Sequence, residues 1–531
     1  MNNTTALAEK PQAKITYTSS GADLEEFHRL YDRALSEVRG RLGAAYQLLI
    51  GGKSVASSKP PLLDLMPGDK SVVLGKFAQA SPAHVKAAIK AAREAASAWG
   101  HTPWRERLKV LRRASQIVRE RKYELAAVMS LEVGKSRMEA MGEVEESADL
   151  IDYYSSRMEE ENGYEKPMKP MSPGEKTTSV LRPYGVFAVI APFNFPFALS
   201  TGMTAGALIG GNSVIFKPSQ DAPWTGVLLG ECYVRAGIPA GVFNVLTGRS
   251  SVMGDELWRS PEVDGIAFTG SKDVGYRLLS EGALRGWPRP VIVEMGGKNA
   301  AVVTESADLE LAAEGVMRSA FGLQGQKCSA CSRVYVDKKV EKEFTELLIE
   351  KTRKIKIGDP SDKDVFFGPV INEKAVKTFE AAVKEARRGG GKILCGGKRM
   401  SESGLAKGFY VEPTIAKLPL KHKLNFRELF VPFVAINAVS GLDEAIAESN
   451  KAEYGLTAGI FSRRPEEIER FFDEVQAGTC YANRRGGATT GAWPGVNSFG
   501  GWKASGSTGK NGLGPYYVAQ FMHEQSRLVA G

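Results

Sequence analysis

The feature that most constrains the fold is a series of short apolar segments that alternate with longer segments of helical spacing from about residue 177 onward. Short runs rich in Val, Ile and Phe are typical of strands buried on both faces. Their alternation with helices is the βαβ pattern of parallel sheets. The predicted strands are 186–190, 213–216, 265–269, 291–294, 300–303, 332–336 and 433–436. We therefore expect an α/β protein with two series of strands, the second running from about residue 299 to 499.

The chain before residue 177 is dominated by helical spacing. The segments with this spacing are 22–39, 84–99, 103–128 and 143–158. A short strand and turn is expected at 46–52, and the Pro- and Lys-rich segment 165–175 is expected to be a loop. At the other end of the chain, the apolar run 516–522 predicts a terminal strand that needs a partner, either in another subunit or in its own.

Composition and charge argue against several classes of protein. Five cysteines are too few, and odd in number, for a disulfide framework, so a reducing compartment is expected. The N-terminus has neither an apolar signal core nor an Arg-rich transit pattern, which favours a cytoplasmic protein. Lys and Arg are interspersed with Asp and Glu despite a net charge of +9, so we expect no nucleic-acid partner. The uncharged stretch 185–216 is interrupted by Pro, Asn and Gly, which favours a buried strand, helix and strand over a membrane span.

Cys328 is the strongest candidate for chemistry. It lies in a Gly-rich loop beside Lys327, and a nearby cation or helix N-terminus favours the nucleophilic thiolate. Glu294 ends an apolar strand and precedes two glycines that allow movement, so its carboxylate can act as a partner base. Asn194 lies between phenylalanines and prolines, where a buried amide can donate to an oxyanion. Together these residues indicate covalent chemistry on a carbonyl.

Each of these residues also has a structural alternative. A free cysteine is most often a small buried core residue, and Asn194 can satisfy the backbone of its own turn. Cys331 completes a Cys-x-x-Cys spacing, but no second cysteine pair or histidine cluster supplies further ligands, so no metal is expected. Regulatory oxidation of the cysteine pair stays open.

Two segments are weak candidates for binding phosphate or ribose. The Gly-Lys-Ser triplets at 52–54 and 134–136 lack the earlier glycine that a P-loop requires, and no Gly-x-Gly-x-x-Gly sequence follows a strand. The segment 268–275 does follow a strand and can open a helix whose N-terminal amides face a phosphate. Lys217 ends a strand, where open α/β sheets bind ligands. A plain turn and a surface lysine are the alternatives.

Taken together, the motifs resemble those of the aldehyde dehydrogenase superfamily from about residue 45 to the C-terminus. In the order of that family they are Pro192-Phe193-Asn194-Phe195-Pro196, Phe216-Lys217-Pro218-Ser219, residues 236–244, Phe268-Thr269-Gly270-Ser271, Glu294-Met295-Gly296-Gly297-Lys298, Gly325-Gln326-Lys327-Cys328 and Glu428-Leu429-Phe430. Each motif is modest alone, and seven in order make the resemblance specific.

The resemblance implies NAD(P)-dependent oxidation of a small-molecule aldehyde to an acid. The Cys328 thiolate would attack the aldehyde, and the Asn194 amide and the Cys328 N–H would hold the oxyanion of the thiohemiacetal. After hydride transfer, Glu294 would activate water to hydrolyse the thioester. The residues implied to bind the cofactor are Lys217, Ser219, Gly270, Ser271, Gly275, Glu428 and Phe430. Gln220 replaces an acidic residue common in NAD-preferring members, so NAD is expected and NADP is possible.

Within the superfamily the chain is most similar to the 1-pyrroline-5-carboxylate dehydrogenases, which oxidise L-glutamate γ-semialdehyde to L-glutamate in proline catabolism. A helical extension at 20–45 is typical of that branch. The resemblance implies that the Ser329 hydroxyl and the amides of Gly491 and Ala492 grip the substrate carboxylate. It also implies that Phe195 and Phe499 clamp the aliphatic chain of the substrate.

Three departures from the branch leave the substrate open. They are Trp493-Pro494 in place of small aliphatic residues, an expanded segment 484–488, and Val431-Pro432 after Phe430. The alternative is another semialdehyde or a broad range of aldehydes. An alternative of another class is a non-catalytic family member with a binding role.

The implied architecture is a Rossmann-like dinucleotide-binding domain, a second α/β catalytic domain and a small β element for oligomerisation. We assign residues 1–165 and 184–296 to the first domain, with a helical extension at its N-terminus, and residues 297–499 to the second. Residues 166–183 and 500–531 supply the oligomerisation strands and tail. A homo-oligomer is expected, either a dimer or an assembly of dimers.

Overall fold

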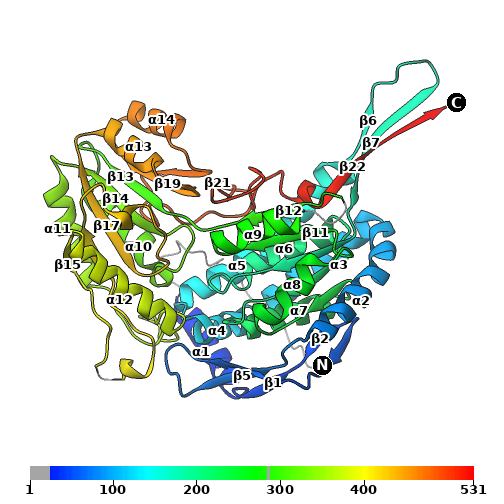
Figure 1. The fold of residues 1–531 in the computed structure, drawn as a ribbon, viewed down its shortest axis with the longest axis horizontal. Helices are drawn as coiled ribbons and strands as arrows, with labels where there is room; N and C mark the ends of the chain where they lie inside the picture. Colours follow the sequence, from blue (N-terminus) through cyan, green and yellow to red (C-terminus); the bar gives the residue numbers. More distant parts are fainter. Residues whose placement is uncertain (1–23, 284–286, 403) are drawn as a thin grey trace, which may run out of the picture.

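The computed structural model describes residues 24–283, 287–402 and 404–531, and it is built on two seven-stranded sheets (Figure 1). The first sheet has the strand order β12-β11-β8-β9-β10-β2-β3. Its strands are β2 (Leu48–Ile50), β3 (Lys53–Val55), β8 (Val186–Ile190), β9 (Ser213–Lys217), β10 (Phe243–Val245), β11 (Gly265–Thr269) and β12 (Val291–Glu294). The strands from β8 to β12 are parallel, whereas β2 and β3 are antiparallel. The strands predicted in this part of the chain are confirmed.

Both faces of the first sheet are covered by helices, because its central strands are apolar throughout. On β8, Val186 and Ala188 join a core cluster with α2 (Pro82–His101) and α8 (Ser250–Arg259). Phe187 and Val189 point to the other face, as alternate residues of a strand must. There they pack in the large core with the helices α3 (Trp104–Glu120), α4 (Lys122–Val133), α5 (Arg137–Glu160), α6 (Ala198–Ile209) and α7 (Pro223–Arg235).

The order of these strands creates a crevice at the carboxyl edge of the first sheet. The chain runs from β8 through α6 and α7 to β9 and β10 on one side, and then crosses to place β11 and β12 on the other side of β8. Open α/β sheets bind their ligands at such a reversal. The loops after β8 and β11 carry Asn194 and Gly270, while Lys217 ends β9 and Glu294 ends β12. Four predicted site residues therefore share this edge.

The second sheet has the strand order β15-β16-β17-β14-β13-β19-β20. Its strands are β13 (Asn299–Val303), β14 (Cys331–Asp337), β15 (Lys392–Cys395), β16 (Thr414–Lys417), β17 (Phe433–Val439), β19 (Thr457–Phe461) and β20 (Thr479–Ala482). All except β15 run parallel. Only residues 295–298 separate β12 from β13, so the chain passes directly from the carboxyl edge of the first sheet to the amino edge of the second. Cys328 lies just before β14, at that amino edge.

The N-terminal helices differ from prediction at one point. The described part of the first helix is α1 (Leu24–Arg39), and the predicted helices at 84–99 and 143–158 are confirmed by α2 and α5. A single helix over 103–128 is wrong, because the chain turns at Arg121 (φ −100°, ψ 10°) between α3 and α4. The Arg121 guanidinium bridges Glu124 and Glu231 at 2.8 and 2.9 Å. The first 23 residues, on which the expectation about a leader sequence rests, lie outside the described residues.

A three-stranded sheet projects from the body as an arm (Figure 1). It contains β6 (Glu165–Met168), β7 (Glu175–Pro183) and β22 (Met522–Ala530), with β7 in the middle. The prediction of a loop over 165–175 is wrong in its first part, because β6 pairs with β7 as an edge strand, where Pro167 is tolerated. The strand predicted at 516–522 is also wrong. Phe521 ends the 3-10 turn η5 (Val518–Phe521) and is buried, and a mostly exposed strand follows it.

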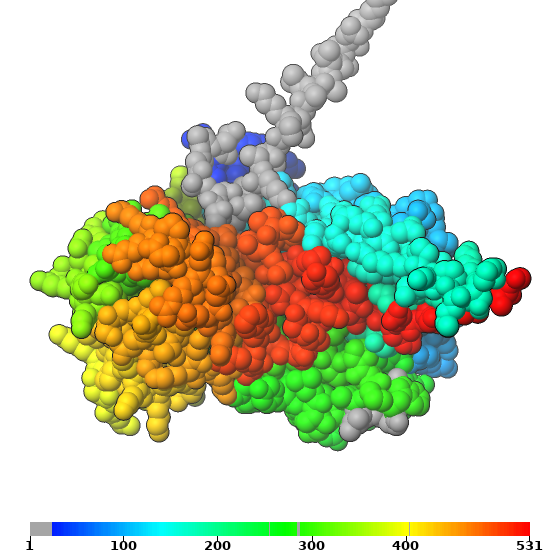
Figure 2. Space-filling model, turned by 90° about the horizontal axis from the view of Figure 1, so that it is seen from above, coloured from blue at the N-terminus to red at the C-terminus, as the bar shows by residue number. Residues whose placement is uncertain are grey.

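The C-terminal part of the chain binds the two halves of the molecule together. Figure 2 shows it in red at the middle of one face, between the orange segments of the second half and the green segments of the first. In the first half, β1 (Ala44–Tyr46), β4 (Leu62–Leu65) and β5 (Val73–Phe77) form a small additional sheet. Among the described residues, no helix combines the length and apolar character needed to cross a bilayer. The domain boundaries drawn from the sequence stay a prediction.

Candidate active site

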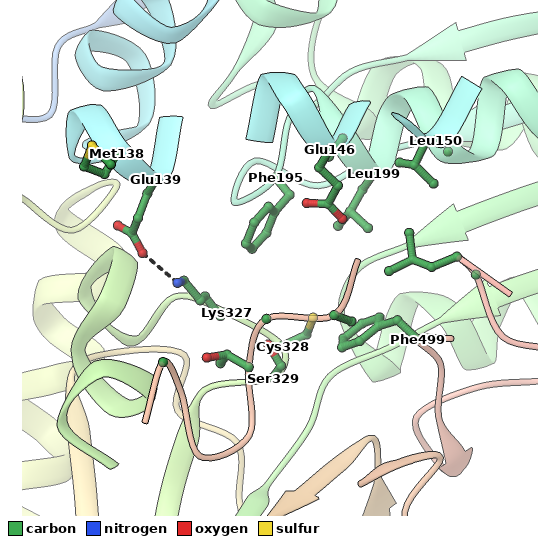
Figure 3. A pocket seen from close by; sticks show the side chains of 18 of the residues that line it. Met138, Glu139, Glu146, Leu150, Phe195, Leu199, Lys327, Cys328, Ser329 and Phe499 are labelled. Carbon is green, nitrogen blue, oxygen red and sulfur yellow. Dashed lines mark hydrogen bonds and ion pairs between the residues drawn. The ribbon is translucent and has the colours of Figure 1, made fainter. Parts of the chain in front are cut away.

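A cavity of about 300 Å³ lies where the edges of the two sheets meet. Its lining includes Glu294, Cys328 and Ser329, with α5 on the opposite wall, as Figure 3 shows for most of these side chains. Such a volume is sufficient for a small organic molecule. The structure thus brings the predicted nucleophile and the predicted base to one space.

The loop before Cys328 has a strained backbone. In the turn η2 (Gly322–Gly325), Leu323 and Gln324 have φ angles of 45° and 54°, which side chains other than glycine rarely adopt. Gly325 also has a positive φ, and a Cβ there would lie 2.7 Å from the Val431 carbonyl oxygen. Strain of this kind persists only where the surroundings enforce it, and it is concentrated at functional sites.

Two side chains from other elements hold the Cys328 loop in place. Asn299, the first residue of β13, donates from Nδ2 to the carbonyl oxygens of Cys328 at 2.7 Å and Ala330 at 2.9 Å. Its Oδ1 accepts from the Thr457 amide at 3.0 Å. On the other side, the Thr489 hydroxyl donates to the Ser329 carbonyl at 2.6 Å. Sequence analysis missed Asn299, although its position directly after the Gly-Gly-Lys segment was the available signal.

The surroundings of the Cys328 thiol disfavour its thiolate form. Burial first, and then the carboxylates of Glu294 and Glu428, raise its pKa well above the ordinary value. The expectation that the neighbouring cation favours the thiolate is wrong, because Lys327 forms an ion pair with Glu139 at 2.6 Å (Figure 3). The thiol must therefore pass its proton to a base before the sulfur can attack.

Glu294 has the properties of a poised general base. Its Oε1 is buried and has no hydrogen-bond partner among the described residues. Burial, together with the negative charge of Glu146, raises the pKa of Glu294 to about 8. A carboxyl with a pKa near the working pH can both accept and release a proton efficiently. Glu294 also lines a second, smaller cavity on the side of Thr508 and Asn511.

The two glycines after Glu294 serve close packing. A Cβ on Gly296 would lie 2.1 Å from the Glu428 carboxylate, and a Cβ on Gly297 would lie 2.4 Å from the Cys328 carbonyl oxygen. The Gly297 amide donates to Glu428 at 2.9 Å. Burial raises the pKa of Glu428 to about 7. Approach of the Cys328 and Glu428 loops requires glycine at both positions, and the movement inferred from the sequence stays a prediction.

The loop that carries Asn194 rests on a buried ion pair. Glu143 of α5 accepts hydrogen bonds from the amides of Phe197 and Ala198, at 2.8 and 3.0 Å, at the start of α6. Lys135 forms an ion pair with Glu143, and its Nζ lies 3.6 Å from the centre of the Phe195 ring. The Gly-Lys-Ser triplet at 134–136 thus supports this loop. The Asn194 side chain is buried and makes no hydrogen bond within the described residues, while Phe195 lines the cavity.

The carboxyl edge of the first sheet suits a dinucleotide. Lys217 is buried, and burial lowers its pKa to about 8. Ser271 is the N-cap of α9 (Lys272–Gly282) but makes no side-chain capping bond, so the first amides of the helix are available to a phosphate. Ser219 is half-buried beside Lys217, and Gln220 is exposed. The buried Lys217 and the free amides at the start of α9 are suited to bind the ribose and the pyrophosphate of a dinucleotide.

Gly275 and Phe430, which the sequence also assigned to the cofactor, lie in closely packed parts of the structure. A Cβ on Gly275 would lie 2.4 Å from the Met295 sulfur, so this glycine allows α9 to approach the segment after β12. Phe430 has a φ of 58°, and its ring meets that of Phe193 edge-on at 5.9 Å. Gly275 allows this close packing and Phe430 lies beside the Asn194 loop, and the assignment of both residues to the cofactor stays a prediction.

The far end of the cavity contains several free hydrogen-bond donors. The predicted residues Phe195, Ser329, Gly491, Ala492 and Phe499 all line the cavity. Neither the Gly491 nor the Ala492 amide donates a hydrogen bond within the described residues. The Gly491 carbonyl accepts one from Arg484 at 2.6 Å, which holds the loop. Sequence analysis did not identify the wall of α5 that faces them, from which Glu139, Glu146 and Leu150 line the cavity. Their spacing along one helical face was the available signal.

Comparison with known proteins gives a consistent result. Residues 56–526 match the Aldehyde dehydrogenase family. The chain is 36% identical over 513 residues to the 1-pyrroline-5-carboxylate dehydrogenase of Geobacillus sp. (strain WCH70), covering 96% of this chain and 97% of that protein. It resembles the crystal structure of 1-pyrroline-5-carboxylate dehydrogenase from Thermus with bound NAD, with a TM-score of 0.92, 34% identity and coverage of 99% and 100% of the two chains. The betaine aldehyde dehydrogenase of Staphylococcus aureus in complex with NAD+ has a TM-score of 0.88 at 26% identity, covering 94% and 97% of the chains.

Proposed function

The chain belongs to the aldehyde dehydrogenase family, and we propose that it oxidises L-glutamate γ-semialdehyde to L-glutamate with NAD. The observation that carries this proposal is the single cavity that contains the Cys328 thiol, the Glu294 carboxyl and the free amides of Gly491 and Ala492. A non-catalytic role would not require an unpartnered buried carboxyl beside a thiol on a strained loop. The fold and the reaction expected from the sequence are thus supported together.

The polar groups of the cavity complement an amino acid that carries an aldehyde. The Ser329 hydroxyl and the amides of Gly491 and Ala492 are neutral donors that can bind its α-carboxylate. Glu146, on the opposite wall, places a carboxylate where an ammonium group is favoured, whereas Glu139 is paired with Lys327. Phe195 and Phe499 supply apolar surface for the aliphatic chain between the ends.

The first chemical step joins the Cys328 sulfur to the aldehyde carbon. The thiol proton passes to a base in the cavity, the sulfur forms a bond to carbon, and the carbonyl oxygen becomes an oxyanion. The Asn194 amide and the Cys328 backbone N–H are our assigned donors to that oxyanion. The hydrogen bond from Asn299 to the Cys328 carbonyl holds the backbone of the nucleophile in place.

The second step removes hydride and then frees the acid. NAD, when bound, accepts the hydride of the thiohemiacetal carbon, which leaves a thioester on Cys328. Lys217, Ser219, Gly270, Ser271 and Glu428 are assigned to hold the cofactor at the carboxyl edge of the first sheet. Glu294 takes a proton from water, the water oxygen bonds to the thioester carbon, and the sulfur leaves as the thiolate. The neutral Gln220 permits NADP as a second cofactor.

Steady-state kinetics with a panel of aldehydes test this function. We expect NAD reduction with glutamate γ-semialdehyde at a kcat/KM well above that of pentanal, which has the same chain length without charges. Cys328→Ala should abolish turnover while NAD still binds. Fast oxidation of pentanal without oxidation of the semialdehyde would contradict the substrate, and turnover by Cys328→Ala would contradict the mechanism.

We also propose that the arm mediates self-association. The outer edge of β22 has no partner strand among the described residues, and Leu528 and Val529 are 58% and 63% exposed. An unpaired edge with apolar side chains favours pairing with another chain. Light scattering of a variant truncated after residue 521 should show a smaller assembly than that of the full chain. An unchanged mass would contradict this proposal.

A further inference from the structure

The loop that carries Gly491 and Ala492 makes a hydrogen bond to α5. Trp493, the next residue, donates from its indole Nε1 to Asp149 Oδ2 at 2.7 Å. Asp149 in turn accepts a hydrogen bond from Arg119 at 3.0 Å through its other oxygen. The carboxylate is therefore oriented from one side and holds the indole on the other.

Trp493 ties the middle of the loop to α5, while Arg484 holds the Gly491 carbonyl at 2.6 Å and the Gly495 amide donates to the Leu513 carbonyl at 3.1 Å. The start of the loop is fixed by Thr489, which donates to the Ser329 carbonyl, and its end by the Phe499 amide, which donates to the Gly512 carbonyl at 2.7 Å. Between these ends, Gly495 (φ 72°) lies so close to Tyr153 of α5 that a Cβ would be 2.9 Å from the ring. Trp493 and Gly495 therefore both hold the loop against α5.

The same helix forms the opposite wall of the cavity. Asp149 is adjacent to Leu150 and one turn from Glu146, and both of these residues line the cavity. The Trp493–Asp149 bond therefore connects the α5 wall directly to the residue that follows the free amides of Gly491 and Ala492, and it contributes to the spacing between them. That spacing determines whether a carboxylate at one end and an aldehyde at Cys328 can be bound together.

We infer that Trp493, through its hydrogen bond to Asp149, is a positioning residue that sets the selectivity of the cavity for a carboxylate-bearing aldehyde. This inference rests on the proposed function and assigns a use to the tryptophan that departs from the small aliphatic residues of the branch. Trp493 acts through the backbone of Gly491 and Ala492, and the chemistry at Cys328 does not depend on it.

The test replaces Trp493 with Phe, which keeps an aromatic ring and removes the N–H donor. For glutamate γ-semialdehyde we expect KM to rise roughly tenfold, the size expected for loss of one hydrogen bond to a charged group, with kcat within about twofold. The KM for pentanal should stay within about twofold, and the inhibition constant of L-glutamate as a competing product should rise with the KM of the semialdehyde. Trp502→Phe, at a half-exposed tryptophan outside the cavity, is the matched control and should change none of these values.

A double-mutant cycle separates the bond from general loosening of the loop. Asp149→Leu should reproduce the KM change of Trp493→Phe, and the double variant should be no worse than Asp149→Leu alone. Asp149→Asn keeps an oxygen that can accept from the indole, and it should retain most of the selectivity. Equal losses for both aldehydes, or additive effects in the cycle, would overturn the inference.

The two proposals fail in different ways. If the wild-type protein oxidises the semialdehyde but Trp493→Phe leaves its KM unchanged, only the positioning role is wrong. If the wild-type protein does not oxidise the semialdehyde, the proposed function is wrong and the selectivity inferred here falls with it.

Discussion

The carbonyl oxygen of Cys328 lies 2.7 Å from Asn299 Nδ2, so the nucleophile loop is fixed by a side chain at the start of a buried strand. The same amide reaches the Ala330 carbonyl, and its oxygen is bound by Thr457. These three hydrogen bonds of the Asn299 side chain are all made with backbone groups. The Cys328 loop is therefore held rigidly against the second sheet.

Replacement of Asn299 by Ala should lower kcat more than it raises KM. Loss of both donors frees the Cys328 loop, and a displacement of about 1 Å at reacting atoms costs on the order of 100-fold in rate. We expect kcat to fall roughly 10- to 100-fold while the affinity for NAD is unchanged. Asn437→Ala provides the control, because Asn437 is also a buried, hydrogen-bonded asparagine and does not line the cavity. Equal kcat values for the two variants would contradict the assigned role.

The pH dependence of thioester hydrolysis should report Glu294. Because its pKa is raised to about 8, the fraction of charged base, and with it the rate of hydrolysis, should increase as pH rises from about 6, reach half of its maximum near pH 8 and level off above about pH 9. In Glu294→Gln this rise should disappear, and an acyl group should accumulate on Cys328. Rapid-quench mass spectrometry of the protein at several pH values measures both. A wild-type profile that is flat across this range would contradict the general-base role.

The Lys135–Glu143 pair should matter for stability and for the Asn194 loop. Lys135→Met leaves the Glu143 carboxylate buried without its cation, a change that typically costs about 3–5 kcal/mol. The double variant Lys135→Met, Glu143→Gln removes both charges, and it should recover most of this loss in chemical denaturation. Its kcat should remain below that of the wild type, because the start of α6 loses an anion at its N-terminus. Full recovery of kcat would show that the pair is structural only.

Lys298 should destabilise the folded protein. Its Nζ is buried without a hydrogen-bond partner among the described residues, and burial, followed by the nearby Arg333, lowers its pKa to about 7. Since the unfolded chain binds this proton up to about pH 10.5, the contribution of Lys298 to stability should become less unfavourable as pH rises from about 7 to 10. Lys298→Met should raise the free energy of unfolding by roughly 1–3 kcal/mol at pH 7 and flatten this dependence. A lower stability of the variant would indicate that the ammonium group has a partner in solution.

The strands and the reacting residues were predictable because their patterns are local. Val186–Ile190 and Val291–Glu294 are apolar on both faces, which is typical of strands buried within a parallel sheet. The glycines around Cys328 and after Glu294 indicated special backbone geometry, although the reason for Gly297 became clear only from its contact with the Cys328 carbonyl. Such a contact joins loops from different strands, and the local sequence of neither loop indicates it.

The wrong predictions for the segment 516–522 and for Lys327 also result from contacts between parts of the chain that are distant in sequence. Tyr517 and Phe521 look like strand residues, but Tyr517 stacks on Tyr154 at 5.3 Å and Phe521 packs against Phe187 at 5.1 Å, and this tertiary packing holds the chain in a turn. Lys327 was expected to favour the thiolate, but it forms an ion pair with Glu139, which lies on α5, far away in the sequence. Partners remote in sequence decided both outcomes.

The chain crosses between the two halves of the molecule near Glu294 and again near Gly506, and these two segments lie side by side. Glu294 pairs with Gly506 in an antiparallel bridge, and the Met295 amide donates to the Ser505 carbonyl at 2.9 Å. A rotation that opens the entrance for a dinucleotide would have its pivot at these paired crossings. Points on a pivot move least, so the sulfur and the carboxylate would keep their alignment during such a rotation.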